Sequence, residues 1–380
     1  MKKIPSTLKN KRVFLRVDFN VPVKKGKVMD NYKMSRAYPT IKLLLKQKNQ
    51  IIIASHLGRP EGKVIKEMSL KPVFNHFKKD YPKVKVSFIS DYSKVDSCKS
   101  QIIILENLRF YQEEYDNDKT FAKLLSLMAD VYVNEAFAFC HRPTASMVAI
   151  TKYLPSYAGG NLIHEEKYLE NALRPKKPAI LIIGGSKLET KEPVVKKFLP
   201  KYDNILIGGI LANTFLSAKG YTLGSSLGLD KSDVQKAKKM LKSKKIILPI
   251  DVIVTDKKTK KKVRVVQLES EKQICNKNEM VLDIGPQTAT FYASLIKKSK
   301  TVVWNGPMGY FEDEKFRNGS LSIARAIASS KTTSIAGGGE TILIINMSKT
   351  EKRFSFISTG GGAMLEYLSG KTLPGLKSLK

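Results

Sequence analysis

The amino-acid sequence predicts an α/β protein made of two doubly wound parallel-sheet lobes joined by a helix. Short, β-branched apolar runs alternate with longer amphipathic, lysine-rich stretches along the whole chain. The runs are apolar throughout rather than at every second residue, as in parallel strands that are covered on both faces. They form two sets, separated near residues 157–160, and each set is long enough to build a sheet.

The first set predicts the sheet of an N-terminal lobe over residues 1–160. Its expected strands are Val13–Val17, Ile51–Ala54, Val84–Ile89, Ile102–Leu105 and Val131–Asn134. A helical pattern from about Ile163 to Leu173 follows, with Asn161 or His164 as its start and Pro175 as its stop. Residues 161–174 are therefore expected to form a connecting helix.

The second set predicts a C-terminal lobe over residues 175–366. Its expected strands are Ala179–Ile183, Asn204–Ile207, Ile246–Leu248, Val302–Trp304, Thr333–Ala336 and Ser355–Ser358. The apolar runs Ile250–Val254 and Val263–Leu268 flank a lysine-rich segment, which is typical of an exposed hairpin loop.

The net charge of +33, from 67 Lys and Arg against 34 Asp and Glu, favours anionic partners. Nucleotides, phosphorylated metabolites, nucleic acid and acidic membranes all fit, although lysines spread along the chain are also typical of a solvated surface. The three cysteines, without CxxC pairing, indicate a reducing compartment and argue against structural zinc. Neither a signal peptide nor an apolar run of roughly 18 residues is found, so we expect a cytoplasmic protein without membrane contact.

Basic side chains follow the strands of the first lobe. Arg16 ends the first strand, His56 and Arg59 follow the second, Arg109 follows the fourth and Arg142 follows the fifth. Each arginine alone could be a salt-bridge partner, but several at the carboxyl edge of one sheet would repel one another without a shared anion. The pattern indicates a pocket for a small molecule that carries both phosphate and carboxylate groups.

Glycines follow the strands of the second lobe. The clusters are Gly184-Gly185, Gly208-Gly209, Asn305-Gly306-Pro307-Met308-Gly309, Gly337-Gly338-Gly339 and Gly360-Gly361-Gly362. Glycines allow backbone N–H groups to approach phosphate, and a following helix adds its dipole, so this edge is expected to bind a nucleotide. A GxxxxGK[ST] loop is absent, and no clean GxGxxG follows the first strand, which argues against P-loop enzymes and dinucleotide dehydrogenases.

Charged residues near these glycines suggest how the phosphates are bound. Lys187 and Lys191 would share the first turns of a helix after Gly185, although an exposed helical pair is the alternative. Glu340 is the best Mg²⁺ candidate, because Mg²⁺ is often held by one carboxylate together with phosphate oxygens and waters. An anion pocket and a nucleotide pocket together imply phosphoryl transfer, and closure of the lobes would exclude water. No general base is evident, which suits an acceptor that is already an anion, such as a carboxylate.

Several motifs in order along the chain resemble the phosphoglycerate kinase family. They are Arg16-Val17-Asp18-Phe19-Asn20-Val21-Pro22, Ser55-His56-Leu57-Gly58-Arg59-Pro60, Glu106-Asn107-Leu108-Arg109-Phe110, Trp304-Asn305-Gly306-Pro307-Met308-Gly309, Ala336-Gly337-Gly338-Gly339 and Ser358-Thr359-Gly360-Gly361-Gly362-Ala363. The resemblance implies a hinge-closing kinase that transfers a phosphoryl group between 1,3-bisphosphoglycerate with MgADP and 3-phosphoglycerate with MgATP. It also implies a cytoplasmic monomer, no specific nucleic-acid partner, and a tail, 367–380, that joins the N-terminal lobe.

The resemblance assigns roles to individual residues. The expected substrate-binding residues are Arg16, Asp18, Phe19, Asn20, Lys33, His56, Leu57, Gly58, Arg59, Arg109 and Arg142. The expected nucleotide-binding residues are Gly185, Lys187, Lys191, Gly209, Ile210, Asn305, Pro307, Glu312, Gly338, Gly339, Glu340 and Thr341, with Glu312 at the ribose and Glu340 at the metal. The expected catalytic residues are Lys33, Lys187, Lys191 and Gly338.

The chain departs from the family pattern at the expected chemistry. Lys33 stands where the family has the arginine that stabilises the transferring phosphoryl group. A lysine keeps the charge but not the two parallel donors of a guanidinium, so we expect a low kcat. Arg36, one turn further on, is a candidate to replace part of this lost contact. Ala138 and Phe139 replace a glycine and a threonine, Ile210 replaces a glycine beside the base, and Glu340 replaces an aspartate.

Two alternatives to an active kinase follow from the same residues. A degenerate, non-enzymatic relative could bind anionic polymers such as nucleic acid through the +33 charge, but no aromatic RNA-binding signature supports it. A nicotinamide-dependent dehydrogenase would need the dinucleotide fingerprint that the chain lacks.

Overall fold

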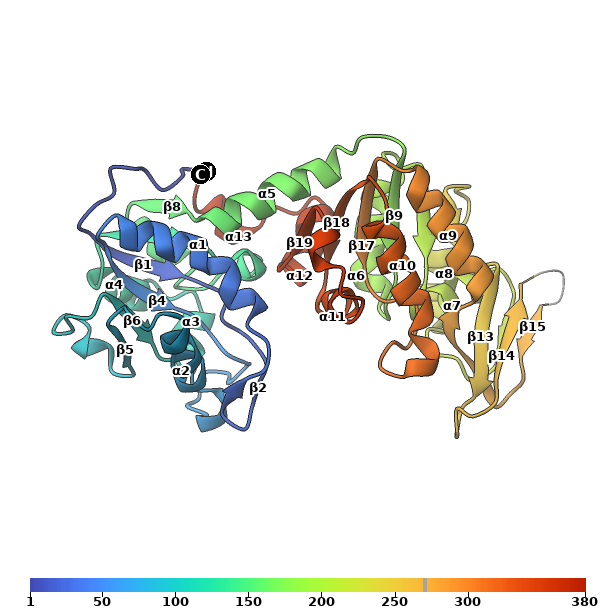
Figure 1. The fold of residues 1–380 in the computed structure, drawn as a ribbon, viewed down its shortest axis with the longest axis horizontal. Helices are drawn as coiled ribbons and strands as arrows, with labels where there is room; N and C mark the ends of the chain where they lie inside the picture. Colours follow the sequence, from blue (N-terminus) through green and yellow to red (C-terminus); the bar gives the residue numbers. More distant parts are fainter. Residues whose placement is uncertain (269–271) are drawn as a thin grey trace. The chain divides into compact units, whose positions relative to one another are not determined.

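The computed structural model describes residues 1–268 and 272–380. The chain divides into two compact units, of which the first comprises Met1–Lys167 with Thr372–Lys380 and the second comprises Tyr168–Lys371. Each unit contains its own six-stranded sheet (Figure 1). The predicted fold class, with two parallel-sheet lobes, is confirmed.

The sheet of the first unit has the strand order β5-β6-β4-β1-β7-β8, and every pairing is parallel. The strands are β1 (Arg12–Arg16), β4 (Gln50–Ala54), β5 (Val86–Ile89), β6 (Ile102–Leu105), β7 (Val131–Asn134) and β8 (Ser156–Ala158). The four inner strands β1, β4, β6 and β7 are buried almost throughout, as expected of strands with both faces covered, whereas the edge strands β5 and β8 are half-buried. The predicted strands are confirmed with small shifts at their ends, and β8 was not predicted.

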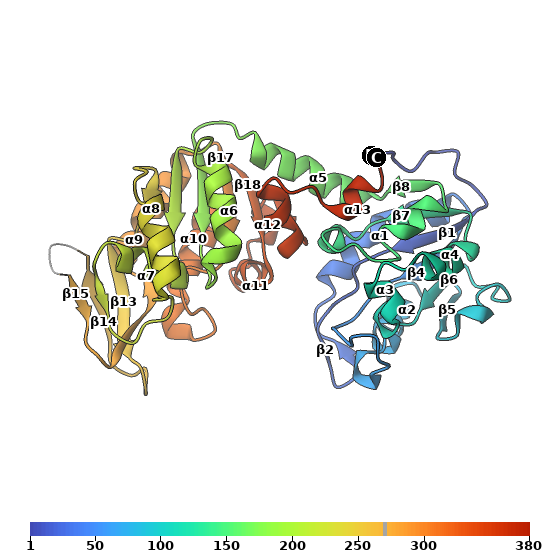
Figure 2. The ribbon, with the colours of Figure 1, turned by 180° about the vertical axis from the view of Figure 1, so that it is seen from behind.

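The helices of the first unit cover this sheet (Figures 1 and 2). They are α1 (Tyr32–Lys46), α2 (Lys71–Asp80), α3 (Gln112–Tyr115), α4 (Lys119–Leu127) and α13 (Pro374–Lys377), and a small hairpin joins β2 (Val23–Lys24) to β3 (Lys27–Val28). Helix α1 buries Met34, Ala37 and Ile41, which lie on one face at helical spacing. In the C-terminal tail, Leu373, Leu376 and Leu379 are buried, and the Gly375 amide donates to the carbonyl of Cys140 at 2.9 Å.

The sheet of the second unit has the order β12-β10-β9-β17-β18-β19 and is also parallel. Its strands are β9 (Ala179–Ile183), β10 (Asn204–Ile207), β12 (Ile246–Ile247), β17 (Thr301–Asn305), β18 (Thr333–Gly337) and β19 (Phe356–Ser358). The helices are α6 (Leu188–Phe198), α7 (Gly209–Ala218), α8 (Lys231–Met240), α9 (Pro286–Lys298), α10 (Asn318–Ala328), α11 (Gly339–Met347) and α12 (Gly362–Leu368). Helices α7, α11 and α12 each begin within a glycine cluster, so the predicted glycine turns are also helix starts.

A second, antiparallel sheet extends this unit. It has the order β14-β13-β16, with β13 (Asp251–Asp256), β14 (Val263–Gln267) and β16 (Glu279–Ile284). The pairing of β13 with β14 confirms the predicted hairpin. Strand β16 and the short pair of β11 (Thr222–Leu223) with β15 (Gln273–Cys275) were not predicted.

Helix α5 (Gly160–Leu173) follows β8 and matches the predicted connecting helix, although it starts before Asn161. The Gly160 amide donates to Thr40 Oγ1 at 3.0 Å, and the Asn161 amide donates to Glu135 Oε1 at 3.0 Å. These side chains satisfy amides that have no partner inside the helix. Among the helices of the described residues, none combines the length and the apolar character that crossing a bilayer demands.

Candidate functional site

The carboxyl ends of β1, β4 and β7 lie side by side in the first unit. Arg16 at the end of β1 pairs in register with Ala54 of β4 and with Asn134 of β7. The segments that follow these strands therefore leave the sheet at one edge. Because ligands of open parallel sheets bind at this edge, it is the candidate anion site of the unit.

His56 lies at the centre of this edge and is buried. Its pKa is held well below the usual value, first by burial and then by the nearby positive charges of Arg16, Arg109 and Lys33. The imidazole is therefore neutral at neutral pH. A guanidinium can only donate, and Arg16 Nη2 lies 3.3 Å from His56 Nδ1, so Nδ1 accepts and Nε2 carries the proton. His56 can thus donate a hydrogen bond to an anion through Nε2.

Arg16 is fully buried, and the protein itself engages its guanidinium. Nε donates to Ser146 Oγ at 2.8 Å, Nη1 donates to the carbonyl of Val17 at 2.6 Å, and Nη2 lies 4.0 Å from Glu114 Oε1. Because each nitrogen of its guanidinium already has a partner in the protein, Arg16 is placed to orient the His56 ring rather than to bind a ligand directly. Its predicted direct contact with substrate stays a prediction.

The other arginines of the edge are more open. Arg109 is partly buried, and its Nη1 donates to the carbonyl of Gly58 at 2.6 Å. Burial lowers the pKa of Arg109, the charges of Arg16 and Arg59 lower it further, and Tyr115 and Glu114 oppose the shift. The side chains of Arg59 and Arg142 are exposed. An anion bound here would relieve the repulsion among these cations.

Lys33 and Asp18 form an ion pair at the start of helix α1. Lys33 Nζ donates to Asp18 Oδ2 at 2.8 Å, and Asp18 Oδ1 accepts from the amide of Asn20 at 3.2 Å. Arg36, one turn further along α1, donates from Nε to Asn161 Oδ1 at 3.1 Å. Arg36 is therefore used to hold the start of α5, and this contact gives no support to its suggested replacement of the missing arginine.

Some predicted substrate residues offer only their backbone to this edge. Phe19 is fully buried and packs against Phe77 with ring centroids 6.0 Å apart, and Leu57 is also buried. Gly58 adopts a positive φ of 64°, and its amide donates to Asn20 Oδ1 at 3.1 Å. Asn20 and Gly58 thus fix each other's loops.

In the second unit, the glycine-rich strand ends enclose a polar hollow. It is lined by Gly185, Ser186, Lys187, Thr190, Lys191, Asn305, Gly306, Gly338, Gly339, Glu340, Thr341, Gly361, Gly362 and Leu365. Asn305 organises its floor, because its Oδ1 accepts from Lys191 Nζ and its Nδ2 donates to the carbonyl of Gly337 at 2.6 Å. Thr341 Oγ1 accepts from the amide of Gly306 at 2.8 Å and joins two of the glycine turns.

The two lysines of the polar hollow differ in their surroundings. Lys187 is exposed, whereas Lys191 is buried on α6. Burial lowers the pKa of Lys191 to about 8, although the nearby carboxylate of Glu340 opposes this shift. A phosphate bound beside Lys191 would restore the ammonium form, which makes this lysine a strong candidate for phosphate binding.

Backbone geometry explains why two positions beside the hollow are glycine. Gly338, at the start of α11, has a φ of 103°, which side chains rarely adopt. Gly209, at the start of α7, has a φ of 63°, and a Cβ there would lie 2.7 Å from the Gly185 amide nitrogen. Both turns therefore need glycine to bring backbone amides to the hollow.

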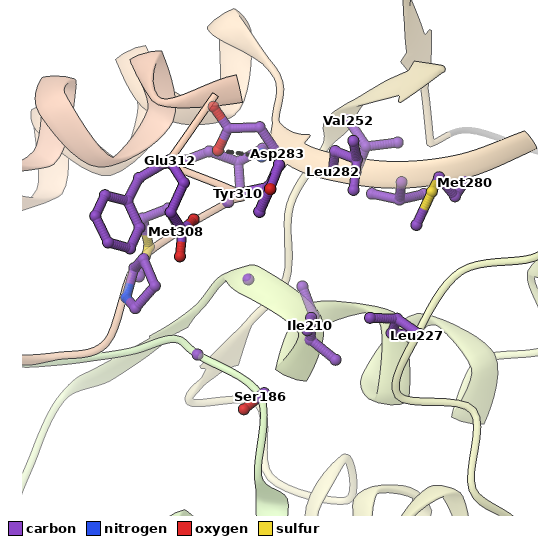
Figure 3. Close-up of a pocket in the computed structure, with 18 of the residues that line it drawn as sticks. Ser186, Ile210, Leu227, Val252, Met280, Leu282, Asp283, Met308, Tyr310 and Glu312 are labelled. Carbon is purple, nitrogen blue, oxygen red and sulfur yellow. Dashed lines mark hydrogen bonds between the residues drawn. The ribbon is translucent and has the colours of Figure 1, made fainter. Parts of the chain in front are cut away.

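An apolar cleft adjoins the polar hollow, and Gly185, Ser186 and Glu340 line both. Ile210 and Leu227 form one side, facing Val252, Met280 and Leu282 (Figure 3). Met308, Tyr310 and Glu312 complete another part of the lining. The predicted Gly209, Ile210, Pro307 and Glu312 all line this cleft. An apolar slot beside a phosphate hollow suits a nucleoside, with the base in the slot.

Sequence analysis missed several residues of the apolar cleft. Leu227, Val252, Met280 and Leu282 carry no polar group and stand in no glycine motif, so their pattern is the same as that of core residues. One signal in the sequence was that the expected hairpin follows the strand at Ile246–Ile247 without an intervening helix, which sets it apart from the parallel sheet.

The residues beside Glu340 fit a metal only in the company of a nucleotide. Within residues 1–268 and 272–380, no three His, Cys, Asp or Glu side chains gather as a metal-binding group. Glu340 stands in the first turn of α11 and lines the polar hollow. One carboxylate beside a phosphate site is the donor set with which Mg²⁺ binds nucleotides, because phosphate oxygens and waters supply the other ligands.

Comparisons with known proteins agree with this geometry. The family model described as "Phosphoglycerate kinase" matches residues 2–371. The phosphoglycerate kinase of Clostridium botulinum (strain Kyoto / Type A2) is 41% identical over 388 residues, which cover 98% of this chain and 96% of that protein. The phosphoglycerate kinase of Clostridium tetani is 39% identical, with the same coverage.

Solved structures show the same relationship. The phosphoglycerate kinase of Coxiella burnetii is 39% identical with a TM-score of 0.86, covering 98% of this chain and 97% of that chain. The enzyme of Pyrococcus horikoshii OT3 is 31% identical with a TM-score of 0.87, covering 100% of this chain and 98% of that chain. Sequence and fold agree over nearly the whole length, and the chain belongs to the phosphoglycerate kinase family.

Proposed function

We propose that this chain catalyses the reversible phosphoryl transfer between 1,3-bisphosphoglycerate with MgADP and 3-phosphoglycerate with MgATP. The observation that carries the proposal is the presence of two complementary sites. One unit has cations gathered around His56, and the other has a glycine-lined hollow beside an apolar cleft. The first suits a small phosphorylated acid and the second suits a nucleotide.

In the first unit, the proposed substrate contacts are made by the side chains that remain open. Arg59, Arg109 and Arg142 bind the phosphate and carboxylate groups, and His56 donates from Nε2. Asp18, Asn20 and the backbone of Phe19, Leu57 and Gly58 shape the loops around the acid. Residues 1–160 with the tail 367–380 thus form the proposed glycerate-binding lobe.

In the second unit, the nucleotide lies with its base in the apolar cleft and its phosphates in the polar hollow. Lys187, Lys191 and the backbone amides at Gly338, Gly339 and Thr341 hold the phosphates, and Glu312 serves the ribose. Glu340 would hold Mg²⁺, which supplies charge neutralisation on the phosphate oxygens when bound. Residues 175–366 form the proposed nucleotide-binding lobe.

The proposed reaction needs no general base. A carboxylate oxygen of 3-phosphoglycerate attacks the γ-phosphorus of ATP, the bond from that phosphorus to the β–γ bridging oxygen breaks, and ADP leaves with the electron pair. The acceptor is already an anion, so no proton has to be removed. Catalysis then rests on positioning and on the neutralisation of charge by Lys33, Lys187, Lys191 and the amide of Gly338.

Location and assembly remain predictions. We propose a cytoplasmic protein, because its three cysteines are free, and a monomer, as the family resemblance implies. Its partners are the small-molecule substrates.

A coupled assay tests the proposed function. The protein is given 3-phosphoglycerate and MgATP, and 1,3-bisphosphoglycerate formation is followed through an enzyme that consumes it. We expect turnover that depends on both substrates and on Mg²⁺. Duplex DNA binding is measured in parallel at two salt concentrations, because the +33 charge alone would produce weak, steeply salt-dependent binding. Tight DNA binding without turnover would overturn the proposal.

A further inference from the structure

Phe139 lies among the anion-binding groups of the first unit, although it has no polar atom of its own. The Arg16 guanidinium carbon lies 4.7 Å from the centre of its ring, and that of Arg109 lies 4.9 Å away. The His56 ring lies 4.5 Å from it, centre to centre, with a tilt of 31°. One buried aromatic ring therefore contacts three of the residues that form the candidate anion site.

The orientation of the Arg109 side chain depends on the Phe139 ring more than that of Arg16 does. Arg16 is held by hydrogen bonds from each of its nitrogens, as described above. The Arg109 side chain donates from Nη1 to the carbonyl of Gly58, and its buried Nε has no partner among the described residues. Tyr115, at 5.6 Å from the guanidinium carbon, is the second ring beside Arg109. Beyond that one hydrogen bond, contacts with the rings of Phe139 and Tyr115 hold the Arg109 guanidinium in its orientation.

The Phe139 ring also offsets part of the electrostatic repulsion between the Arg16 and Arg109 guanidinium groups. Arg16 and Arg109 repel each other, and burial removes part of the water that would screen them. The face of an aromatic ring carries partial negative charge and attracts guanidinium groups within about 6 Å. Phe139 therefore stabilises the crowded arrangement before any anion arrives.

The loop that carries Phe139 is itself held in place. The Arg142 amide donates to the carbonyl of Phe139 at 3.0 Å, and the Gly375 amide of the C-terminal tail donates to the carbonyl of Cys140. The Phe139 side chain is 3% exposed, so it has little freedom to turn away. Because the backbone of this loop is fixed, the Phe139 ring is held in place against the side chains of Arg109 and His56.

We propose that Phe139 is a positioning residue for the phosphorylated acid, which acts by holding the Arg109 fork and the His56 ring in their binding orientation. The inference rests on the proposed function, because it assumes that this edge binds 3-phosphoglycerate. Phe139 does not touch the reacting atoms. Its loss should therefore weaken binding of the acid and leave the chemical step nearly unchanged.

The test compares Phe139→Leu with the parent in the coupled assay, and measures 3-phosphoglycerate binding directly by calorimetry without nucleotide. We expect the KM and Kd for 3-phosphoglycerate to rise about three- to tenfold, the range of one cation–π contact. We expect kcat and the KM for MgATP to change less than twofold. Phe139→Tyr keeps the ring face and should restore the parental KM.

Two further comparisons separate positioning from general damage. Phe74→Leu removes a buried ring from α2 in the same unit and should leave the KM for 3-phosphoglycerate unchanged. If Phe139 acts partly through Arg109, then Phe139→Leu should raise the KM for 3-phosphoglycerate less in an Arg109→Ala background than in the parent. Should Phe139→Leu fail to fold, Phe139→Met fills similar space without a ring and repeats the comparison.

The outcomes are distinguishable. An unchanged KM in Phe139→Leu, an equal loss in Phe139→Tyr, or a loss confined to kcat would overturn the positioning role while leaving the kinase function intact. A parent that neither binds nor converts 3-phosphoglycerate would instead overturn the proposed function itself.

Discussion

Lys33, which stands where the family resemblance leads us to expect an arginine, pairs its single ammonium group with Asp18 at 2.8 Å. A guanidinium could keep one nitrogen on Asp18 and direct another to the transferring phosphoryl group, whereas an ammonium offers a single point of charge. We predict that Lys33→Arg raises kcat about tenfold, as expected for one additional charge-assisted hydrogen bond. The coupled assay at saturating substrates measures this change.

Lys42→Arg is the matched control for that variant. Lys42 is an exposed residue of the same helix, α1, so its replacement should leave kcat unchanged. Turnover of Lys33→Arg that stays level or falls would show that the lysine does not limit the chemistry. Arg36 offers no simple compensation, because its Nε is bonded to Asn161.

Ile210 places a branched side chain in the apolar cleft of the second unit, facing Met280 and Leu282 (Figure 3). If the cleft binds the base as proposed, this side chain narrows the space that the base can occupy. We predict that Ile210→Gly lowers the KM for MgATP about threefold, an effect of less than one kcal/mol for a pocket that fits better. The KM for 3-phosphoglycerate, whose proposed site lies in the other unit, is the internal control. Equal ATP affinity in the variant and the parent would count against this role of Ile210.

Residue identities at the site could be predicted from sequence where a motif marked them, but their roles could not. Arg16 and Arg109 stand at equivalent strand ends, and the pattern treats them alike. In the structure, the buried Arg16 is satisfied by Ser146 and Val17, whereas Arg109 keeps donor groups for a ligand. The two arginines differ because their hydrogen-bond partners, such as Ser146 for Arg16 and Gly58 for Arg109, lie far away in the sequence, where a local pattern does not reveal them.

At the scale of elements, the first turn of helix α5 is hydrogen-bonded to the buried carboxyl group of Glu135. Glu135 Oε1 accepts from Thr40 Oγ1 at 2.7 Å and from the Asn161 amide at 3.0 Å, while the buried Oε2 has no partner among the described residues. Burial raises the pKa of Glu135 to about 8, although these hydrogen bonds oppose the shift. The carboxyl group is therefore largely protonated at neutral pH in the folded protein.

This raised pKa makes stability depend on pH. The unfolded chain releases the Glu135 proton near pH 4.5 and the folded chain near pH 8, so the contribution is complete below pH 4.5 and is lost as pH rises through 8. Glu135→Gln cannot ionise. We predict that the free energy of unfolding of the parent, relative to Glu135→Gln, falls by about 3 kcal/mol between pH 5.5 and 8.5.

Urea denaturation at the two pH values measures this difference. Asp283, whose pKa burial also raises to about 8, is present in both proteins and cancels in the comparison. Glu113→Gln, at an exposed position of the same unit, should show the same pH dependence as the parent. A difference that is flat with pH would mean that Glu135 ionises in the folded state much as it does in the unfolded chain.

Elements were predictable where one local signal dominated. The strand Ile102–Leu105 is a short, fully apolar run, and Val131–Asn134 is apolar up to its closing asparagine; the structure confirms the bounds of both. Strand β16 was missed because Glu279 and Asp283 interrupt its apolar run. Its burial depends on pairing with β13, a long-range contact that outweighs local propensity.

At the scale of the whole molecule, the net charge of +33 creates a long-range field that attracts anions. Salt screens such a field over about 8 Å at physiological ionic strength, so the close contacts at His56 and Lys191, rather than the overall charge, must provide specificity. Such a field would attract both proposed anionic substrates and would not discriminate between them.

The sequence by itself determined the fold class, the two sets of parallel strands and the glycine turns, because these depend on local apolar pattern and backbone freedom. Its motifs also indicated the family. Only the tertiary structure decided which polar groups remain available to a ligand. Arg16 is committed to Ser146, 130 residues away, and Phe139 supports Arg109 from another loop. Such commitments require distant segments to meet, and they exist only once the chain has folded.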